Sequence, residues 1–256
     1  MITSAFNDVL ATENTSNYSS VTVIIPTRNE VQTIACLLSL LTEIYPEISI
    51  MVVDDSSEDG TQEAVLTFIA SAKFNKRALN RGTITLVERG PIVTPGLTAS
   101  IIHALERCGT EHFVIMDGDL QHPPQAVASV VAKLAGDSEL VVGVREEFPA
   151  DWPLIRRFIS LVATGVSRAY LRSRGIKTTD PLSGFFGGKT EAVRTLLANY
   201  PKRFELRGYK ILLDLLKVAP SNIRIAEVQY RFAVRAQGES KFNAMHGVYF
   251  LRSLFR

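Results

Sequence analysis

The 256-residue sequence has only two cysteines, Cys36 and Cys108, and neither is spaced for a disulfide framework or a zinc site. It has no uninterrupted apolar run of about 18 residues, so no segment is expected to span a membrane. Residues 1–20 lack the basic start, apolar stretch and cleavage site of a signal peptide and are typical of a mobile tail. These absences favour a soluble globular protein of a reducing compartment, as do 46% hydrophobic and 21% charged residues.

Two common phosphate-binding motifs are also missing. No GxGxxG follows the first predicted strand, which argues against a dinucleotide-binding site. Residues 183–190 (SGFFGGKT) carry Ser183 where a P-loop has its first glycine, and they lie far from the first strand. Any nucleotide must therefore be bound through other residues.

The formal net charge of +2 is the sum of two unequal halves. Residues 1–140 carry 8 Lys and Arg against 17 Asp and Glu, whereas residues 141–256 carry 20 against 9. The basic half is predicted to face an anionic partner such as phosphate groups, nucleic acid or a lipid surface. Solvated helices rich in Lys and Arg would give the same count, so both interpretations stand at this point.

Short buried strands alternate with helical segments along the first 145 residues. The predicted strands are 21–25, 48–53, 83–87, 112–116 and 140–144, and the helices between them include 34–41, 62–72 and 97–107. This alternation predicts βαβ units and an α/β fold with a mainly parallel central sheet flanked by helices. Basic amphipathic helices follow from about residue 152, with a strand-like segment at 223–232. No repeat or linker divides the chain, so a single domain is expected over residues 21–256.

Four of the five predicted strands are followed closely by charged residues that could bind a ligand or take part in catalysis. These residues are Arg28 and Glu30, Asp54 and Asp55, Asp117 and Asp119, and Arg145. Ligands of open parallel sheets bind beyond the carboxyl ends of the strands, so we expect these side chains to share one site. Asp117 and Asp119 are separated only by Gly118, and two such carboxylates can converge on a hard divalent cation. An Asp-rich turn before a helix would give the same three residues.

Three ordered motifs resemble the inverting glycosyltransferases of family 2, which have the GT-A fold. The motifs are residues 26–30 (PTRNE), 54–61 (DDSSEDGT) and 117–124 (DGDLQHPP). Further segments are similar to the dolichol and polyprenol phosphate mannose synthase branch: 143–145 (GVR), 180–185 (DPLSGF), 209–213 (YKILL) and 235–241 (RAQGESK). The resemblance runs from about residue 21 to the C-terminus. It implies a donor and metal half over about 21–145 and an acceptor half over about 146–256.

The resemblance also implies roles for individual residues. The nucleotide sugar would be bound by Pro26, Arg28, Glu30, Val53, Asp55, Asp117, Gly118, Asp119, Lys210 and Arg235, with Lys241 nearby. Mg²⁺ or Mn²⁺ would be coordinated by Asp117, Asp119 and Gln121. The acceptor phosphate would be bound by Arg145, Arg156, Arg157 and Ser160. Asp119 and Arg145 are the implied catalytic residues. Family members usually have an aromatic residue in place of Arg28 and more often have alanine in place of Gly118.

The implied reaction is the inverting transfer of mannose from GDP-mannose to dolichyl or polyprenyl phosphate. A phosphate monoester with a second pKa of about 6 is already an anion near neutral pH, so the acceptor needs no general base. Two alternatives stay open, a polyprenyl-phosphate glucosyltransferase that uses UDP-glucose and a non-catalytic membrane-associated subunit. Nucleic acid is not expected as a partner, because the basic half lacks interleaved aromatic residues and recognised modules.

Membrane contact is expected to be peripheral, at the cytosolic face. Residues 158–170 and 245–255 combine apolar faces with arginines, as helices at the headgroup level of a lipid bilayer do, although core packing predicts a similar pattern. Some relatives in this branch rely on a small membrane-anchoring subunit, and others continue into transmembrane helices. A chain that ended at Arg256 would resemble the first kind, whereas a truncated one would continue into such helices.

Overall fold

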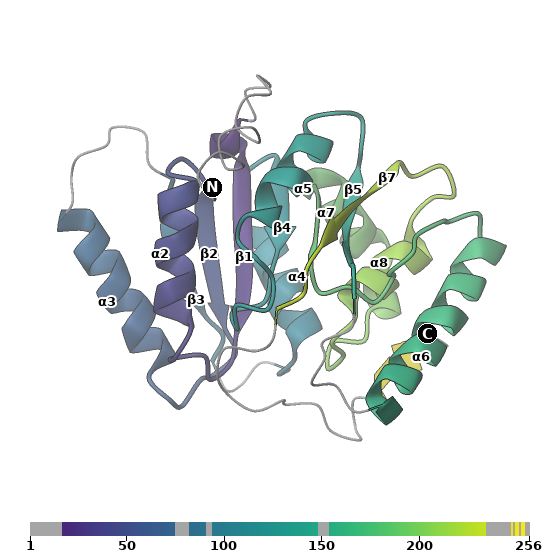
Figure 1. The fold of residues 1–256 in the computed structure, drawn as a ribbon, viewed down its shortest axis with the longest axis horizontal. Helices are drawn as coiled ribbons and strands as arrows, with labels where there is room; N and C mark the ends of the chain where they lie inside the picture. The colour runs from purple at the N-terminus through teal and green to yellow at the C-terminus, as the bar shows by residue number, and fades with distance from the viewer. Residues whose placement is uncertain are drawn as a thin grey trace, which may run out of the picture.

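A seven-stranded sheet with helices on both faces forms the centre of the structure (Figure 1). This computed structural model describes residues 17–74, 82–90, 94–147 and 154–233, together with residues 247, 249–250 and 252–253. The strands are β1 (Val21–Thr27), β2 (Ser49–Asp54), β3 (Ile84–Glu88), β4 (His112–Ile115), β5 (Leu140–Arg145), β6 (Phe186–Lys189) and β7 (Ile225–Tyr230). The α-helices are α2 (Ile34–Ile44), α3 (Thr61–Phe74), α4 (Leu97–Arg107), α5 (Ala126–Leu134), α6 (Leu154–Ser173), α7 (Thr190–Asn199) and α8 (Ile211–Val218).

The strand order is β3-β2-β1-β4-β6-β5-β7, and only β6 runs antiparallel to its two neighbours. The five strands predicted from buried apolar runs are confirmed to within two residues at each end. The strand-like segment at 223–232 is confirmed as β7. Strand β6 was not predicted, because Gly187 and Gly188 have low strand propensity and give no apolar alternation.

Alternate residues of the strands face two separate hydrophobic cores. Ile24 of β1 and Val53 of β2 point to one face, where α4, α7 and α8 pack. Ile25 and Val52 point to the other face, where α2, α3 and α5 pack. The alternation follows from the two-residue period of a strand, and burial on both faces explains why the strands are almost uninterrupted runs of Val and Ile.

The position of β1 places the loops that carry the predicted site. Strand β1 pairs in parallel with β2 on one side and with β4 on the other. The chain therefore crosses to opposite sides of β1, which creates a switch point where the connecting loops diverge and leave a crevice. The loops after β1, β2 and β4 begin at this edge of the sheet, as the sequence predicts.

The amphipathic helix predicted at 158–170 lies within α6, whereas most of the second predicted helix, 245–255, lies outside the described residues. Residues 1–16 of the predicted tail also lie outside them, and Tyr18–Ser20 form a short 3-10 turn directly before β1. No helix in the described part of the chain is long and apolar enough to cross a membrane.

Replacement of Gly187 by alanine is expected to destabilise the sheet. An added Cβ would lie 2.7 Å from both the Phe113 carbonyl oxygen and Val130 Cγ1, so β6 would have to move away from β4 and α5. We expect Gly187→Ala to lower the free energy of unfolding by about 1–3 kcal/mol in urea titrations. Gly165→Ala, on an open surface of α6, is the control and should be neutral or stabilising. Equal stability of the two variants would contradict the expected packing effect.

Candidate active site

A cavity of about 860 Å³ opens at the carboxyl ends of the parallel strands β1, β2, β4 and β5. The loops after these strands form one side of it, and the segment from Arg207 to Lys210 before α8 forms another. Eleven residues expected in the site line this cavity: Pro26, Arg28, Glu30, Asp55, Asp117, Gly118, Asp119, Gln121, Arg145, Arg156 and Lys210. Residues that lie far apart in the sequence therefore share one cavity.

Four other residues of the expected site are not among the described residues that line the cavity. Val53 is fully buried in the core beneath α4, where it lies within β2 rather than beyond its end, and it does not line the cavity. Arg157 and Ser160 lie on α6 but do not line the cavity. Arg235 lies outside the described residues, as does Lys241.

A tight turn after β4 brings Asp117, Asp119 and Gln121 together. Leu120 has a left-handed backbone with φ of 63°, and the Gln121 N–H donates to Asp119 Oδ1 over 3.1 Å. The Asp117 N–H donates to His122 Nδ1 over 3.0 Å. The Asp119 side chain is thereby held in a buried position at the cavity wall, and the Asp117 side chain lies nearer to solvent.

His122 is a neutral side chain that packs behind these carboxylates and accepts a hydrogen bond from the Asp117 backbone. Its ring stacks on Phe185 at a centroid distance of 5.4 Å and meets Tyr230 and Phe232 edge-on. Burial lowers the pKa of His122 to about 4, so the ring carries no charge at neutral pH. Because Nδ1 accepts the Asp117 N–H, the ring proton of the neutral form resides on Nε2.

The donors in this turn fit a hard divalent cation that shares its ligands with a substrate. Asp117, Asp119 and Gln121 offer oxygen atoms, the ligand type that Mg²⁺ and Mn²⁺ prefer. Gly184 keeps the space beside them clear, since a Cβ there would lie 3.3 Å from Asp117 Oδ2. Within the described ranges, no group of three or more His, Cys, Asp or Glu side chains could hold a metal. A cation bound by two carboxylates would thus need further oxygen ligands from substrate phosphates.

Cationic side chains line the part of the cavity formed by β5, α6 and the loop before α8. Arg145 donates from Nε and Nη2 to Asp180 Oδ2 over 3.1 and 3.0 Å, which fixes its guanidinium. Lys210 Nζ donates to the Leu182 carbonyl over 2.6 Å. Burial and the nearby Arg145 lower the pKa of Lys210 to about 8, so it is largely protonated at neutral pH. With Arg156, these groups make a cationic wall of the cavity, which suits an anionic ligand.

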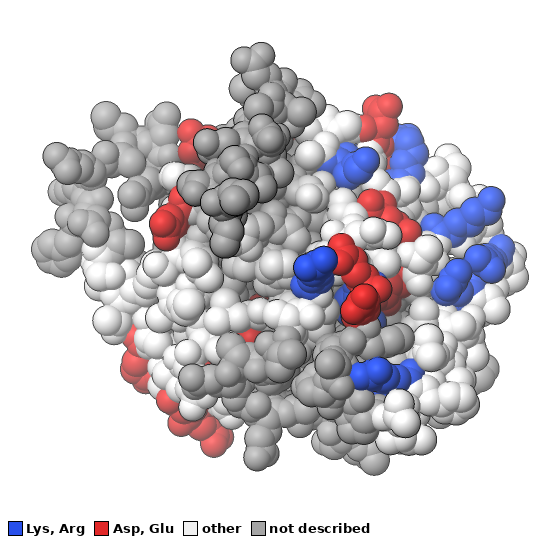
Figure 2. Space-filling model, viewed as in Figure 1, with Lys and Arg blue, Asp and Glu red and all other residues white. Residues whose placement is uncertain are grey.

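The surface charge follows the same division. On the face shown in Figure 2, Lys and Arg gather on the side of β7 and α6, with some Asp and Glu among them, whereas the charged side chains drawn on the side of α2 and α3 are Asp and Glu. Within the cavity itself, carboxylates and cationic side chains lie on different walls, an arrangement that suits a cation at one end and phosphate groups at the other.

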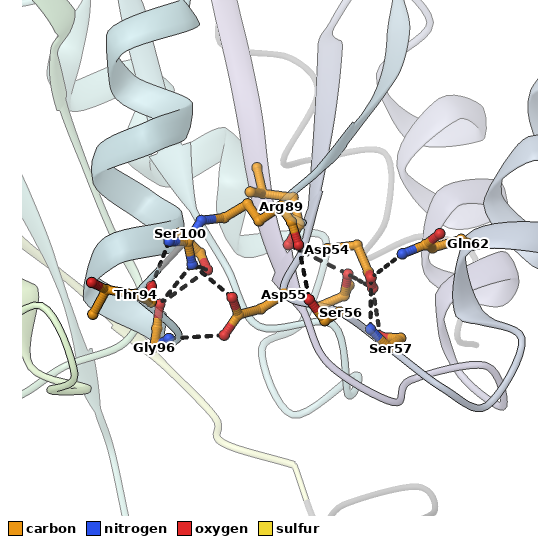
Figure 3. A network of polar contacts seen from close by, with 11 residues as sticks. Asp54, Asp55, Ser56, Ser57, Gln62, Arg89, Thr94, Gly96 and Ser100 are labelled. Atoms are coloured by element: carbon orange, nitrogen blue, oxygen red, sulfur yellow. Dashed lines mark hydrogen bonds and ion pairs between the residues drawn. The ribbon is translucent and has the colours of Figure 1, made fainter. Parts of the chain in front are cut away.

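Arg89 is a residue of the site that the sequence motifs did not reveal. It follows β3, the one of the five predicted strands after which the sequence indicates no candidate site residue. Arg89 is almost completely buried. Its guanidinium bonds to Asp55 and Ser100, as Figure 3 shows. The only signal in the sequence was the position of Arg89 directly after a strand, equivalent to that of Asp55 after β2.

Residues 22–197 match the family model described as Glycosyl transferase family 2. The chain belongs to this family. It is 32% identical to the dolichol-phosphate mannosyltransferase of Mycosarcoma maydis, over 90% of this chain and 76% of that protein. It is 31% identical to the enzyme of the same name from Pyrococcus furiosus, over 92% of this chain and 63% of that longer protein. The resemblance to family 2 predicted from the three motifs is thus confirmed, and the protein is a glycosyltransferase.

The fold of this glycosyltransferase also agrees with solved structures. The glucosyl-3-phosphoglycerate synthase from Mycobacterium tuberculosis, in complex with Mn²⁺, UDP and phosphoglyceric acid, superposes with a TM-score of 0.67. It is 18% identical in sequence, and the match covers 93% of this chain and 78% of that one. The expected α/β fold with a mostly parallel sheet is confirmed.

The neutral state of His122 predicts a pH dependence of stability. In the unfolded chain its pKa returns to about 6.5, so the unfolded state binds a proton first as the pH falls. We expect the free energy of unfolding to drop by about 2 kcal/mol between pH 7 and pH 5 for this reason. Urea titrations of the His122→Gln variant should show a smaller drop by that amount. An equal drop in both proteins would place a charged histidine in the fold.

Proposed function

We propose that this glycosyltransferase transfers mannose from GDP-mannose to dolichyl or polyprenyl phosphate with inversion at the anomeric carbon. The observation that carries the proposal is the single cavity with Asp117 and Asp119 at one wall and Arg145, Arg156 and Lys210 at another. Two phosphate-bearing substrates need such an arrangement. Relatives named dolichol-phosphate mannosyltransferase, at 31–32% identity over most of the chain, support the choice of sugar and acceptor.

The donor is assigned to the crevice between β1 and β4. Pro26, Arg28, Glu30 and Asp55 line this part of the cavity and would hold the nucleoside. Asp117, Asp119 and Gln121 would hold Mg²⁺ or Mn²⁺ beside the diphosphate. The cation would supply charge neutralisation for the leaving nucleoside diphosphate, the main electrostatic demand of the reaction. Lys210 adds a protonated amine close to the same phosphates.

The acceptor is assigned to the cationic wall. The Arg145 guanidinium, fixed by Asp180, and Arg156 would bind the lipid phosphate, with Arg157 and Ser160 close to its path along α6. A bound phosphate dianion can attack the anomeric carbon directly, on the side opposite the departing diphosphate. Attack from that side inverts the configuration, and no side chain has to remove a proton.

Helix α6 offers a surface for peripheral membrane contact. Its exposed apolar side chains are Leu154, Ile155, Phe158, Ile159, Leu161, Val162 and Val166, with Leu154 82% exposed and Phe158 62% exposed. Core packing does not account for these residues. Arg156 lies on the same helix and at the cavity, so a lipid headgroup there would leave its hydrocarbon chain beside the apolar face. The cytosolic face as the location and a small membrane-anchoring subunit as a partner stay predictions from the resemblance.

The reaction is tested by a transfer assay with a short polyprenyl phosphate, Mn²⁺ and a panel of nucleotide sugars. We expect transfer from GDP-mannose to be about 10-fold or more faster than from UDP-glucose. The Asp119→Asn variant should lose about 100-fold or more in turnover, because the charge that holds the cation is removed. Asp137→Asn, at an exposed carboxylate, is the control. Transfer from UDP-sugars alone would contradict the choice of donor, and unchanged turnover in Asp119→Asn would contradict the placement of the active site.

Membrane contact through α6 is tested by co-sedimentation with phosphatidylcholine and phosphatidylglycerol vesicles. The double variant Leu154→Ser and Phe158→Ser should bind vesicles about 10-fold or more weakly, since two apolar side chains no longer enter the lipid. Leu66→Ser, which removes an exposed apolar side chain of α3, is the matched control and should bind like the native protein. Equal loss in both variants would show that α6 is not the contact surface.

A further inference from the structure

Arg89 forms a buried ion pair with Asp55 at the edge of the candidate active site. Its side chain is 2% exposed, and Nη1 lies 2.7 Å from Asp55 Oδ1. The same guanidinium donates to Ser100 Oγ over 2.9 Å and to the Thr94 carbonyl over 2.6 Å (Figure 3). Arg89 thus connects the end of β2 to the loop before α4 and to the first turn of that helix.

The second carboxylate oxygen of Asp55 is also hydrogen-bonded. Its Oδ2 accepts the N–H of Gly96 over 2.8 Å. Gly96 has a φ of 141°, and a Cβ there would lie 2.5 Å from the Leu206 carbonyl oxygen, so only glycine fits. The Asp55 side chain is 11% exposed and lines the cavity. Its orientation is therefore set by Arg89 and the Gly96 backbone together.

The neighbouring Asp54 differs from Asp55 in the number of hydrogen bonds that its carboxylate accepts, and its role is structural. Asp54 is fully buried and accepts four hydrogen bonds, from Thr27, Gln62 and both the N–H and hydroxyl of Ser57. A carboxylate has about four lone-pair positions, so Asp54 is saturated. Asp55 accepts two hydrogen bonds from the described residues, one on each oxygen. Each of its oxygens therefore retains one acceptor position, and the side chain lines the cavity.

We propose that Arg89 is a positioning residue for the nucleotide base, because it pairs with Asp55 and fixes the orientation of that carboxylate at the cavity. The proposal rests on the proposed function for the assignment of Asp55 to the nucleoside. A carboxylate with one free acceptor position on each oxygen matches a base edge with two adjacent N–H donors. Guanine has such an edge in N1–H and the N2 amino group. Uracil offers a single N–H between two carbonyl groups, so the arrangement favours guanine.

An arginine suits this role better than a lysine does. Its planar fork reaches Asp55, Ser100 and Thr94 at once, whereas a lysine presents a single point of charge. Loss of Arg89 would leave the Asp55 carboxylate largely withdrawn from water without a cationic partner. Such an uncompensated charge is unfavourable, so we expect Asp55 to lose the orientation in which it accepts hydrogen bonds from the base. The diphosphate end of the cavity, with Asp117 and Lys210, would be unaffected, because neither residue contacts Arg89 in the hydrogen bonds described.

The test measures binding of GDP, IDP and inorganic pyrophosphate in the presence of Mn²⁺ by isothermal titration calorimetry. IDP lacks the N2 amino group, and pyrophosphate lacks the nucleoside. The native protein should prefer GDP over IDP by about 10-fold, since one acceptor is left unpaired with IDP. In Arg89→Met, GDP affinity should fall by about 30-fold or more, the preference over IDP should vanish, and pyrophosphate affinity should stay within about twofold.

Two further variants are matched to Arg89→Met. Arg89→Lys retains the charge and should recover part of the GDP affinity, which also gives a result if Arg89→Met fails to fold. Ser100→Ala removes a neutral partner of Arg89 and should change GDP affinity by less than about threefold. Loss of GDP and pyrophosphate binding in equal measure in Arg89→Lys would overturn the proposal, because the defect would then be a general one. Equal binding of GDP and IDP by the native protein would also overturn it.

The experiment separates this inference from the proposed reaction. If Asp55→Asn binds GDP as tightly as the native protein while mannose transfer is intact, the inference fails and the proposed function stands. If the Arg89 variants lose GDP selectively while no mannose transfer is found, the inference stands and the proposed function fails.

Discussion

The parallel pairing of β1 with both β2 and β4 is the constraint on which the active site depends. It brings the carboxyl ends of three strands to one edge, although the loops that follow them are separated by tens of residues in the sequence. Backbone hydrogen bonds continue past the strands, from the Asp55 N–H to the Thr27 carbonyl and from the Met116 N–H to the Ile24 carbonyl. The residues that follow each strand therefore start from fixed positions, and the crevice between β1 and β4 needs no further element to hold it open.

Charge within the cavity is controlled by burial. His122 lies directly behind Asp117, and its pKa of about 4 keeps a positive charge away from the two carboxylates that would bind a cation. At the opposite wall, Asp180 partly compensates Arg145, and Lys210, with its pKa lowered to about 8 by burial and by Arg145, is still largely protonated at neutral pH. The two walls therefore carry opposite charges at neutral pH.

The sequence predicts the fold well where local pattern and tertiary environment agree. Buried runs of Val and Ile define the strands on either side of β1, and the bounds of α4 match the prediction. Strand β6 escapes prediction because Gly187 and Gly188 have no local preference for a strand and are held in one by β4 and β5. In the site, the residues that directly follow a predicted parallel strand can be identified from that position in the sequence. Val53 shows the limit, because it lies inside β2 and its side chain is covered by α4, whereas Asp55 lies beyond the end of the strand and lines the cavity. Arg89 has no motif of its own, and only its contacts across the fold reveal it.

Recognition of the base and of the phosphates depends on one continuous framework. Gly96, which holds Asp55, packs against the backbone of Leu206 and Arg207, and the N–H groups of Thr98 and Ala99 donate to the carbonyls of Gly208 and Leu206. The same segment continues into Lys210, whose amine is held by the Leu182 carbonyl at the cationic wall. The loop before α4 and the segment that leads to Lys210 are thus joined by backbone hydrogen bonds, although the Lys210 amine has an anchor of its own that does not include Arg89. In the proposed reaction the anomeric carbon must lie between two phosphates with little tolerance, so backbone contacts that fix the relative positions of these two segments favour catalysis.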